Sequence, residues 1–447
     1  MSQNYFEETP VPKAYFHFTM PVVFSMVLSL VYNMVDTYFI AQTGNTNLVA
    51  GVSLCAPVFT FMIALGDILG LGGSSVISRL FGKQLDGDGK RLSVFCFYGS
   101  FLGGIVVAAV LLLLRQPLLL LLGADTETLS YASQYYSCLA LGAPFIIFSY
   151  APNNLLRTEG FSSASMAGTV LGSVINMVLD PIFIFSLGMG AAGAAVATVL
   201  GNLCADLFFV WFLLTRSRKL SVNPVGFHIS RSELCQILAI GLPASVTNFM
   251  QSIGIALTNR FLLAYGNDKV AAMGIVMKIS MIAVLILVGF AFGIQPLIGY
   301  SYGAENFARL QRVLTFSYRF ECGTAVLLAA ALSLLARPLM GIFVTDQDMI
   351  QTGISMLRMQ QAGMVFVAIV LVTTCTFQSV GKPWCAFLLS VSRQGVIFAV
   401  VISAASWVAG YAGILASQAI SDLLTAGLAI LLYRRCLLRE LRGAPAA

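Results

Sequence analysis

Apolar runs long enough for an α-helix to cross a lipid bilayer recur along the whole chain. One run includes the uninterrupted stretch VVAAVLLLL at residues 106–114, and a crossing needs about 20 apolar residues. Only 10% of the 447 residues are charged, against roughly 25% in soluble domains. Strands of a membrane β-barrel would alternate polar and apolar residues. The continuous runs therefore predict an all-α integral membrane protein.

Hydropathy, together with Gly and Pro positions, predicts twelve crossing helices. Their expected ranges are 15–41, 51–78, 92–114, 129–152, 162–186, 191–214, 233–263, 270–300, 310–336, 351–378, 384–408 and 411–433. Because the number is even, both termini are expected on the same side of the membrane.

Basic residues are distributed unequally between the two sides of this predicted topology. The opposite side holds only Arg115, Arg260, Lys269 and Arg337. The side of the termini holds Lys13, Arg79, Lys83, Lys90, Arg91, Arg157, Arg216, Arg218, Lys219, Arg231, Arg309, Arg312, Lys382, Arg434, Arg435, Arg439 and Arg442. The positive-inside rule then predicts a multi-pass protein of the cell (inner) membrane with both termini cytoplasmic. The net charge of +6 is thus a topology signal, and no nucleic-acid partner is expected.

Motifs for enzymatic chemistry are missing from the sequence. The nine cysteines form no CxxC or Cys/His pattern, so they are interpreted as packing residues rather than metal ligands or disulfides. The two histidines, His17 and His228, form no HExxH, and neither GxSxG nor a P-loop is present. We expect no enzyme, no ATP-driven pump and no cofactor beyond a coupling ion.

The chain contains an internal repeat. Its longest predicted cytoplasmic connection, residues 215–232, falls at the midpoint, and Pro21 aligns with Pro243, 222 positions later. At shifts of 222 or 221 the matched pairs are Phe39 and Phe261, Gly44 and Gly266, Gly82 and Gly303, and Gly160 and Gly381. We predict two pseudo-symmetric six-helix lobes, 1–214 and 233–447, joined by the 215–232 linker. Parallel repeats of this kind are typical of transporters.

Acidic residues inside predicted crossings carry the functional hypothesis, because a carboxylate in lipid is costly. Ser25, Ser29, Tyr32 and Asp36 share one helix face. A second stripe leads through Asn176 to Asp180. Helix directions predict that Asp36, Asp180, Thr198 and Tyr135 share one depth, with Tyr32 and Asn176 a turn deeper. Two carboxylates with amide and hydroxyl oxygens could bind a cation such as Na⁺, or take up and release a proton.

A structural alternative exists for each of these acids. Interhelical hydrogen bonds alone could explain the Asp36 and Asp180 pair, and for Asp67 and Asp206 that interpretation is preferred. The second half has Thr258 and Val401 at the positions that align with Asp36 and Asp180. Ion coupling is therefore expected in the first half alone.

The sequence resembles the multidrug and toxic compound extrusion (MATE) family over nearly its whole length. The resemblance lies in the spacing from Pro21 to Asp36, in NNLLRTEG at residues 153–160 and in NMVLDP at residues 176–181. It implies antiport of H⁺ or Na⁺ against small organic compounds, often cationic and amphipathic, by two lobes. A monomer in contact with membrane lipids is expected.

By position, the resemblance implies that Asp36, Asn176, Asp180 and Thr198 form the ion-coupling site. It implies that Tyr32, Tyr135 and Asn153 surround this site as a polar network. Pro21 is expected either to permit a kink of the first crossing or to fix a bend used only in packing.

The second half departs from one branch of that family. Gln251 stands where NorM-type members have an acid, and residues 351–378 contain neither Asp nor Glu. This indicates a DinF- or MepA-like protein, with Gln251 and Lys278 as candidate substrate contacts.

The rival hypothesis is a lipid-linked oligosaccharide flippase of the same superfamily. Such a protein needs several basic residues in its cavity to hold pyrophosphate. Lys278 and Arg358 keep that alternative open, whereas the acidic first half favours the antiporter.

Overall fold

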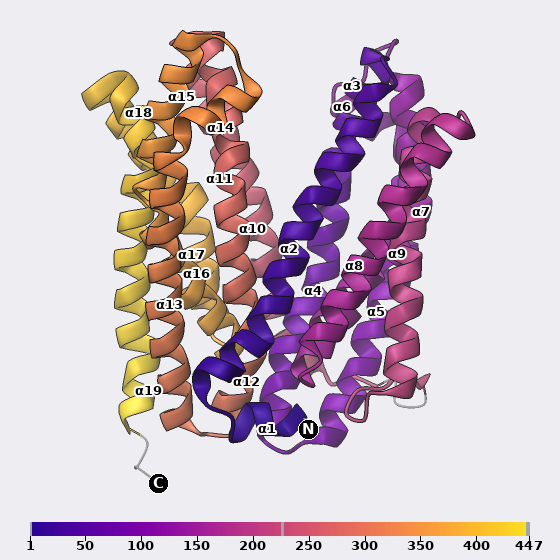
Figure 1. Cartoon of the computed structure of the whole chain (residues 1–447). Helices are drawn as coiled ribbons and strands as arrows, with labels where there is room; N and C mark the ends of the chain where they lie inside the picture. The colour runs from indigo at the N-terminus through magenta and orange to yellow at the C-terminus, as the bar shows by residue number, and fades with distance from the viewer. Residues whose placement is uncertain (1, 225–227, 444–447) are drawn as a thin grey trace. The chain divides into compact units, whose positions relative to one another are not determined.

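The computed structural model of the chain describes residues 2–224 and 228–443, and within these ranges every regular element is helical. The first half contains α1 (Ser2–Glu7), α2 (Val11–Gln42), α3 (Thr46–Leu54), α4 (Ala56–Gly82), α5 (Asp86–Leu113), α6 (Arg115–Leu121), α7 (Leu129–Thr158), α8 (Ser162–Pro181) with the π-helical η1 (Ile182–Ser186), and α9 (Gly190–Thr215) (Figure 1). The predicted all-α class is confirmed for the described residues.

The second half follows the same pattern. It contains α10 (Arg231–Leu263), α11 (Asn267–Gly293), α12 (Gln295–Gly303), α13 (Phe307–Leu334), α14 (Ala336–Phe343), α15 (Gln347–Gln361), α16 (Met364–Val380), α17 (Pro383–Val391), the π-helical η3 (Ser392–Val396), α18 (Ile397–Leu432), η4 (Tyr433–Leu437) and α19 (Leu438–Gly443). Each predicted crossing overlaps one or two consecutive elements of this series, except 384–408, which overlaps α17, η3 and α18.

Nine helical stretches of the described chain are long and apolar enough to cross a membrane, or up to 11 if two bent pairs each count as one span. The pairs are α13 with α14, bent by 62°, and α15 with α16, bent by 43°. The last stretch, Pro383–Leu441, has 59 residues, far more than the about 20 that one crossing needs. Gly410 interrupts it with a non-helical backbone (φ 55°, ψ −129°). The count of twelve, like the cytoplasmic position of the termini, stays a prediction.

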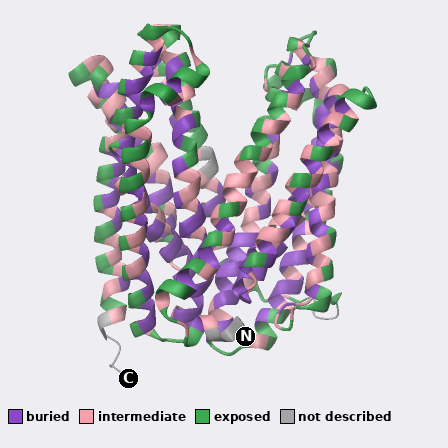
Figure 2. Ribbon diagram, viewed as in Figure 1, coloured by how far each residue is buried: buried purple, intermediate pink, exposed green. Residues whose placement is uncertain are grey.

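Large apolar side chains lie on the outside of the bundles, which is the reverse of what a water-soluble surface requires. Trp407 is 89% exposed, Leu113 82% and Leu334 80%. Exposed positions follow the helices along their length, as Figure 2 shows. Side chains of this kind suit contact with lipid tails.

The helices form two compact units. Unit 1 takes in the chain up to Glu8 and then Phe24–Leu242, and unit 2 takes in Thr9–Val23 and the chain from Pro243 onward. These bounds, drawn from packing, differ from the lobes expected from internal homology, 1–214 and 233–447. The first part of α2 belongs to unit 2 and the first part of α10 to unit 1.

In unit 1, glycines let the start of α10 approach α4 closely. A Cβ on Gly241 would lie 2.1 Å from the carbonyl oxygen of Ile68, and one on Gly72 would lie 2.4 Å from that of Ile237. Glycine is required here because any side chain would push the two helices apart.

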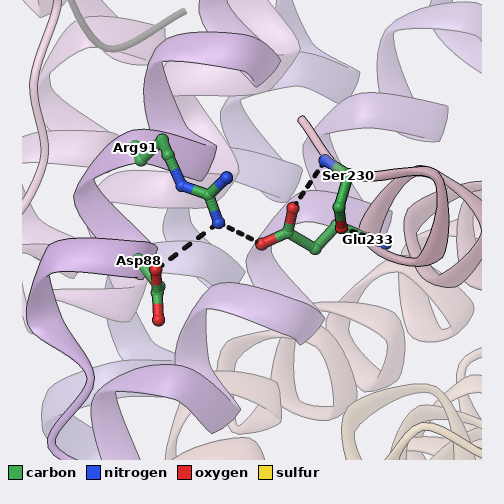
Figure 3. A network of polar contacts seen from close by, with 4 residues as sticks. All are labelled: Asp88, Arg91, Ser230 and Glu233. Carbon is green, nitrogen blue, oxygen red and sulfur yellow. Dashed lines mark hydrogen bonds and ion pairs between the residues drawn. The ribbon is translucent and has the colours of Figure 1, made fainter. Parts of the chain in front are cut away.

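A polar network also fixes the start of α10 to α5 (Figure 3). The guanidinium of Arg91 contacts Glu233 at 2.5 Å and Asp88 at 3.4 Å. The backbone N–H of Ser230 donates to the other carboxylate oxygen of Glu233 at 2.8 Å. Glu233 is thereby held from both sides.

The described part of the expected linker is bonded to unit 1. Glu159 accepts hydrogen bonds from the Ser217 hydroxyl at 2.5 Å and the Arg218 N–H at 2.8 Å, and Lys219 pairs with Asp86 at 3.0 Å. Residues 225–227 of the linker lie outside the described residues. The connection is therefore docked on the bundle that precedes it.

In unit 2, the first part of α2 packs on α11 in the same way. A Cβ on Gly293 would lie 2.6 Å from the Cα of Thr19, and one on Gly289 would lie 2.7 Å from the Cα of Val23. Gly293 follows Gly72 by 221 residues, which is the shift of the internal repeat. The repeat therefore extends to how the first helix of each half is packed.

Candidate ion-coupling site

Two carboxyl groups meet inside unit 1. Asp180 lies in the last turn of α8 and is 0% exposed, whereas Asp36 of α2 is half-buried. The two groups are close enough for a hydrogen bond between them when one holds a proton. The predicted meeting of the two polar stripes thus occurs in the structure.

Asn176 and Thr198 extend this site between α8 and α9. The Asn176 amide donates to the Thr198 hydroxyl oxygen at 3.1 Å, and that hydroxyl donates to the Ala194 carbonyl at 3.1 Å. Both side chains are buried. The helices approach closely because α8 and α9 place Gly172 and Gly201 at their crossing, where a Cβ on Gly201 would lie 2.6 Å from the Gly172 carbonyl oxygen.

Two tyrosines lie beside the carboxyl pair. The Tyr32 hydroxyl is within hydrogen-bonding reach of Thr198 and interacts electrostatically with Asp36 and Asp180. Tyr135 of α7 is buried and interacts with the same two acids. Their phenolic oxygens can donate to a carboxylate or accept from a protonated one.

Several oxygens of this site have no hydrogen-bond donor within the described residues. They are Asp36 Oδ1, Asn176 Oδ1 and both carboxyl oxygens of Asp180. Buried acceptors without partners are costly and rare, and carboxylate, amide and hydroxyl oxygens suit a hard cation. The donor set fits Na⁺ or a bound proton. No group of three or more His, Cys, Asp or Glu side chains placed to hold a metal ion occurs among the residues described.

The hydrogen bonds of Asn153 are made away from this site. Its backbone and side-chain oxygens accept from the Ser165 hydroxyl at the start of α8, and its side-chain oxygen also accepts from Thr169 at 3.5 Å. Asn153 therefore contacts the first part of α8, where the cytoplasmic end of this crossing is predicted. Its partners precede Asn176 by about two helical turns or more.

Asp67 and Asp206 have partners that the sequence did not reveal. Asn154 lies within hydrogen-bonding reach of Asp67, and Arg157 faces it electrostatically. Arg157, expected in a loop, is buried in α7 and bonds Asn154 at 2.5 Å. Asp206 accepts from the Ser149 hydroxyl. These contacts agree with the structural interpretation of both acids.

In unit 2, Gln251 of α10 and Lys278 of α11 are exposed. Neither has a hydrogen-bond or ion-pair partner within the described residues. Arg358 is also exposed and donates to the Ser333 carbonyl at 3.4 Å. Pro21 lies within α2, two residues before the boundary between the units. The roles of these residues stay predictions.

Two buried acids of unit 2 were missed as sites by sequence reasoning. Asp422 pairs with Arg393 at 2.9 Å, and Glu321 accepts from the Tyr15 hydroxyl at 3.3 Å. Both acids lie inside predicted crossings, and this position alone could have marked them as candidate sites. The identity of Tyr15, 306 residues away, was not predictable from any local pattern.

Comparison with known proteins identifies the family. The family model described as MatE matches residues 21–182 and 243–405, two segments whose starts are separated by the 222-residue shift of the repeat. "Multidrug export protein MepA" of Staphylococcus aureus (strain MSSA476) is 30% identical over 428 residues, covering 96% of this chain and 94% of that protein. MepA of Staphylococcus saprophyticus is 29% identical over 432 residues, with the same coverage.

Solved structures of the same fold match along the whole length. One, "Crystal structure of MATE in the straight conformation", has a TM-score of 0.93 at 27% identity and covers 99% of both chains. An "Outward-facing conformation of a multidrug resistance MATE family transporter of the MOP superfamily" has a TM-score of 0.92 at 27% identity, again over 99% of both chains. This chain, a multi-pass membrane protein similar to MepA, therefore belongs to the MATE family.

Proposed function

We propose that the protein is a secondary active antiporter that exports organic, cationic and amphipathic compounds in exchange for inward-moving H⁺ or Na⁺. Membership of the MATE family agrees with a transporter rather than an enzyme. The observation that carries the ion-coupling part is the set of unpaired, buried oxygens of Asp36, Asn176 and Asp180 in unit 1.

The chemistry of the acid pair supports coupling. Two carboxylates held this close repel each other when both are ionised, and a proton or a cation between them relieves the repulsion. The states with and without a bound H⁺ or Na⁺ therefore favour different distances between α2 and α8. Because α2 starts in unit 2 and ends in unit 1, a shift at Asp36 acts on a helix that both units share.

The export direction and the substrate class rest on similarity. The relatives are named multidrug export proteins, and one matching structure is titled as a multidrug resistance transporter. In this proposal Gln251 and Lys278 contribute polar contacts to the substrate from unit 2.

Transport by purified protein in liposomes tests the proposal. An imposed pH gradient or an imposed Na⁺ gradient is expected to drive efflux of ethidium, an organic cation, by the unmodified chain. Asp36→Asn removes one charge with little change in shape, so the variant is expected to fold while its gradient-driven efflux falls to that of empty vesicles. Asp348→Asn, an exposed acid in the first turn of α15, is the matched control and is expected to transport normally. Full gradient-driven efflux by Asp36→Asn would refute the coupling role.

A further inference from the structure

Unit 2 contains a carboxyl group for which the proposed coupling site has no use. Glu321 lies near the middle of α13 and is 0% exposed. Its Oε1 accepts a hydrogen bond from the Tyr15 hydroxyl of α2 at 3.3 Å. Its Oε2 is buried and has no hydrogen-bond partner within the described residues.

Tyr15, the hydrogen-bond partner of this carboxyl group, packs among aromatic rings. The Tyr15 ring lies 5.1 Å from that of Phe316, 5.3 Å from that of Phe320 and 6.1 Å from that of Phe290 on α11. Phe316 and Phe320 precede Glu321 on α13. The hydrogen bond from Tyr15 to Glu321 is therefore made from within an aromatic cluster.

Among the described residues, the titratable groups that interact electrostatically with Glu321 carry no positive charge. They are Tyr15 on α2, Tyr318 and Cys322 on α13, and Cys375 on α16. Arg319, on the same helix, is exposed. No ion pair of Glu321 occurs among the residues described, so an ionised carboxylate here would have neither counter-charge nor water.

A carboxyl group in such surroundings binds a proton, because burying an unpaired charge costs far more than neutralising it. The Tyr15 hydroxyl donates to Oε1 at 3.3 Å, so Oε2, which has no partner within the described residues, is the oxygen that would hold the proton.

We propose that Glu321 is a proton-binding site of unit 2, separate from the acid pair of unit 1, and that the Thr9–Val23 segment seals it through Tyr15. The segment is also held by the Arg309 guanidinium, which donates to the Thr9 carbonyl at 2.9 Å, and by its close packing on Gly289 and Gly293. Loss of the proton leaves an unpaired carboxylate that needs hydration, and water can reach this carboxylate when Tyr15 moves away. Deprotonation therefore weakens the docking of this segment on unit 2.

Infrared difference spectroscopy of the purified full chain tests the protonation directly. A protonated carboxyl group has a C=O stretching band that an ionised carboxylate lacks. The unmodified chain at neutral pH is expected to show such a band that is missing in Glu321→Gln. Tyr15→Phe, which retains the acid, is expected to shift the band because it removes the hydrogen bond. If Glu321→Gln fails to fold, the Tyr15→Phe shift alone decides. The proposal would be overturned if, between pH 5 and 9, no C=O band were lost in Glu321→Gln and none were shifted in Tyr15→Phe.

Hydrogen–deuterium exchange of the peptide that covers residues 11–23 tests the seal. The two proteins are compared at the same pH. The unmodified chain is expected to exchange faster than Glu321→Gln, and the difference is expected to grow as the pH rises, because only the glutamate can ionise. Ser317→Ala is the control: this buried side chain, one turn earlier on α13, bonds the Val313 carbonyl of its own helix, and its exchange is expected to follow the unmodified chain. Equal exchange by all three proteins at every pH would contradict the seal. Neither readout depends on transport, so this proposal and the antiport proposal can fail separately.

Discussion

At the scale of single residues, Thr198 of α9 is bonded to Asn176 of α8 in the candidate ion-coupling site. Its hydroxyl accepts from Asn176 and donates to the Ala194 carbonyl, which leaves one lone pair of its oxygen for an ion or for Tyr32. The Asn176 amide is thereby oriented with its Oδ1 free of protein donors in the described structure. Thr198 therefore fixes the direction of the Asn176 side-chain amide through this hydrogen bond.

Replacing Thr198 by Val removes this hydroxyl and keeps the shape of the side chain. The buried Asn176 amide would lose its acceptor, so we expect a loss of about 1–3 kcal/mol in stability and weaker binding of the coupling ion. Thermal unfolding in detergent, with and without Na⁺, measures both effects. Thr198→Ser retains the hydroxyl and is expected to behave like the unmodified chain. Unchanged stability of Thr198→Val would show that the hydrogen bond contributes nothing.

Sequence reasoning succeeded for residues whose position follows from helix periodicity. Asp36 and Asp180 lie on regular polar stripes, so face and depth together predicted their meeting. Asn153 was placed in the surrounding network by resemblance alone, and its contacts are with Ser165 and Thr169 instead. Glu321 belongs to no stripe, and its partner Tyr15 comes from another helix through tertiary packing.

At the scale of helices, small residues decide which elements can share a site. Gly172 and Gly201 allow α8 and α9 to approach until the Asn176 and Thr198 side chains meet. The predicted helix ranges overlap the observed helices because apolar runs define them, although the ranges 384–408 and 411–433 lie in one continuous stretch of 59 residues. The helix breaks at Ile294 and at Leu335 lie inside predicted ranges and were not predicted, because they depend on packing rather than on hydropathy, whereas the break at Gly410 lies between the predicted ranges 384–408 and 411–433.

Gly201→Ala tests the contact between α8 and α9. The new methyl group would lie 2.6 Å from the Gly172 carbonyl oxygen and 3.0 Å from the Asn176 Cβ, so the helices must separate. We expect a loss of about 1–3 kcal/mol from overpacking and impaired ion-driven efflux. Gly103→Ala in α5 is the matched control, since nothing lies within 4 Å of its Cβ position. It is expected to be neutral or to stabilise by about 0.5–1 kcal/mol. Equal thermal stability of the two variants would contradict the packing argument.

At the scale of the whole molecule, the compact units are not the homologous halves. Each half begins with a helix whose first part packs in the other unit: Thr9–Val23 in unit 2, and the start of α10 in unit 1. Hydropathy and internal homology predicted two six-helix lobes, yet neither detects this exchange, because it is set by close contacts at glycines distant in sequence. In the proposed mechanism, ion binding at Asp36 would act on a helix whose two parts belong to different units.

The central claim is that the acid pair of unit 1 holds the ion exchanged for the exported compound. Ion release on substrate binding tests it most directly. Ethidium is added to purified protein in weakly buffered detergent, and a pH electrode and a Na⁺-selective electrode record what is displaced. The unmodified chain is expected to release H⁺ or Na⁺ in proportion to the ethidium bound. The Asp36→Asn, Asp180→Asn double variant is expected to bind ethidium and release neither. Equal ion release by this variant would contradict the account.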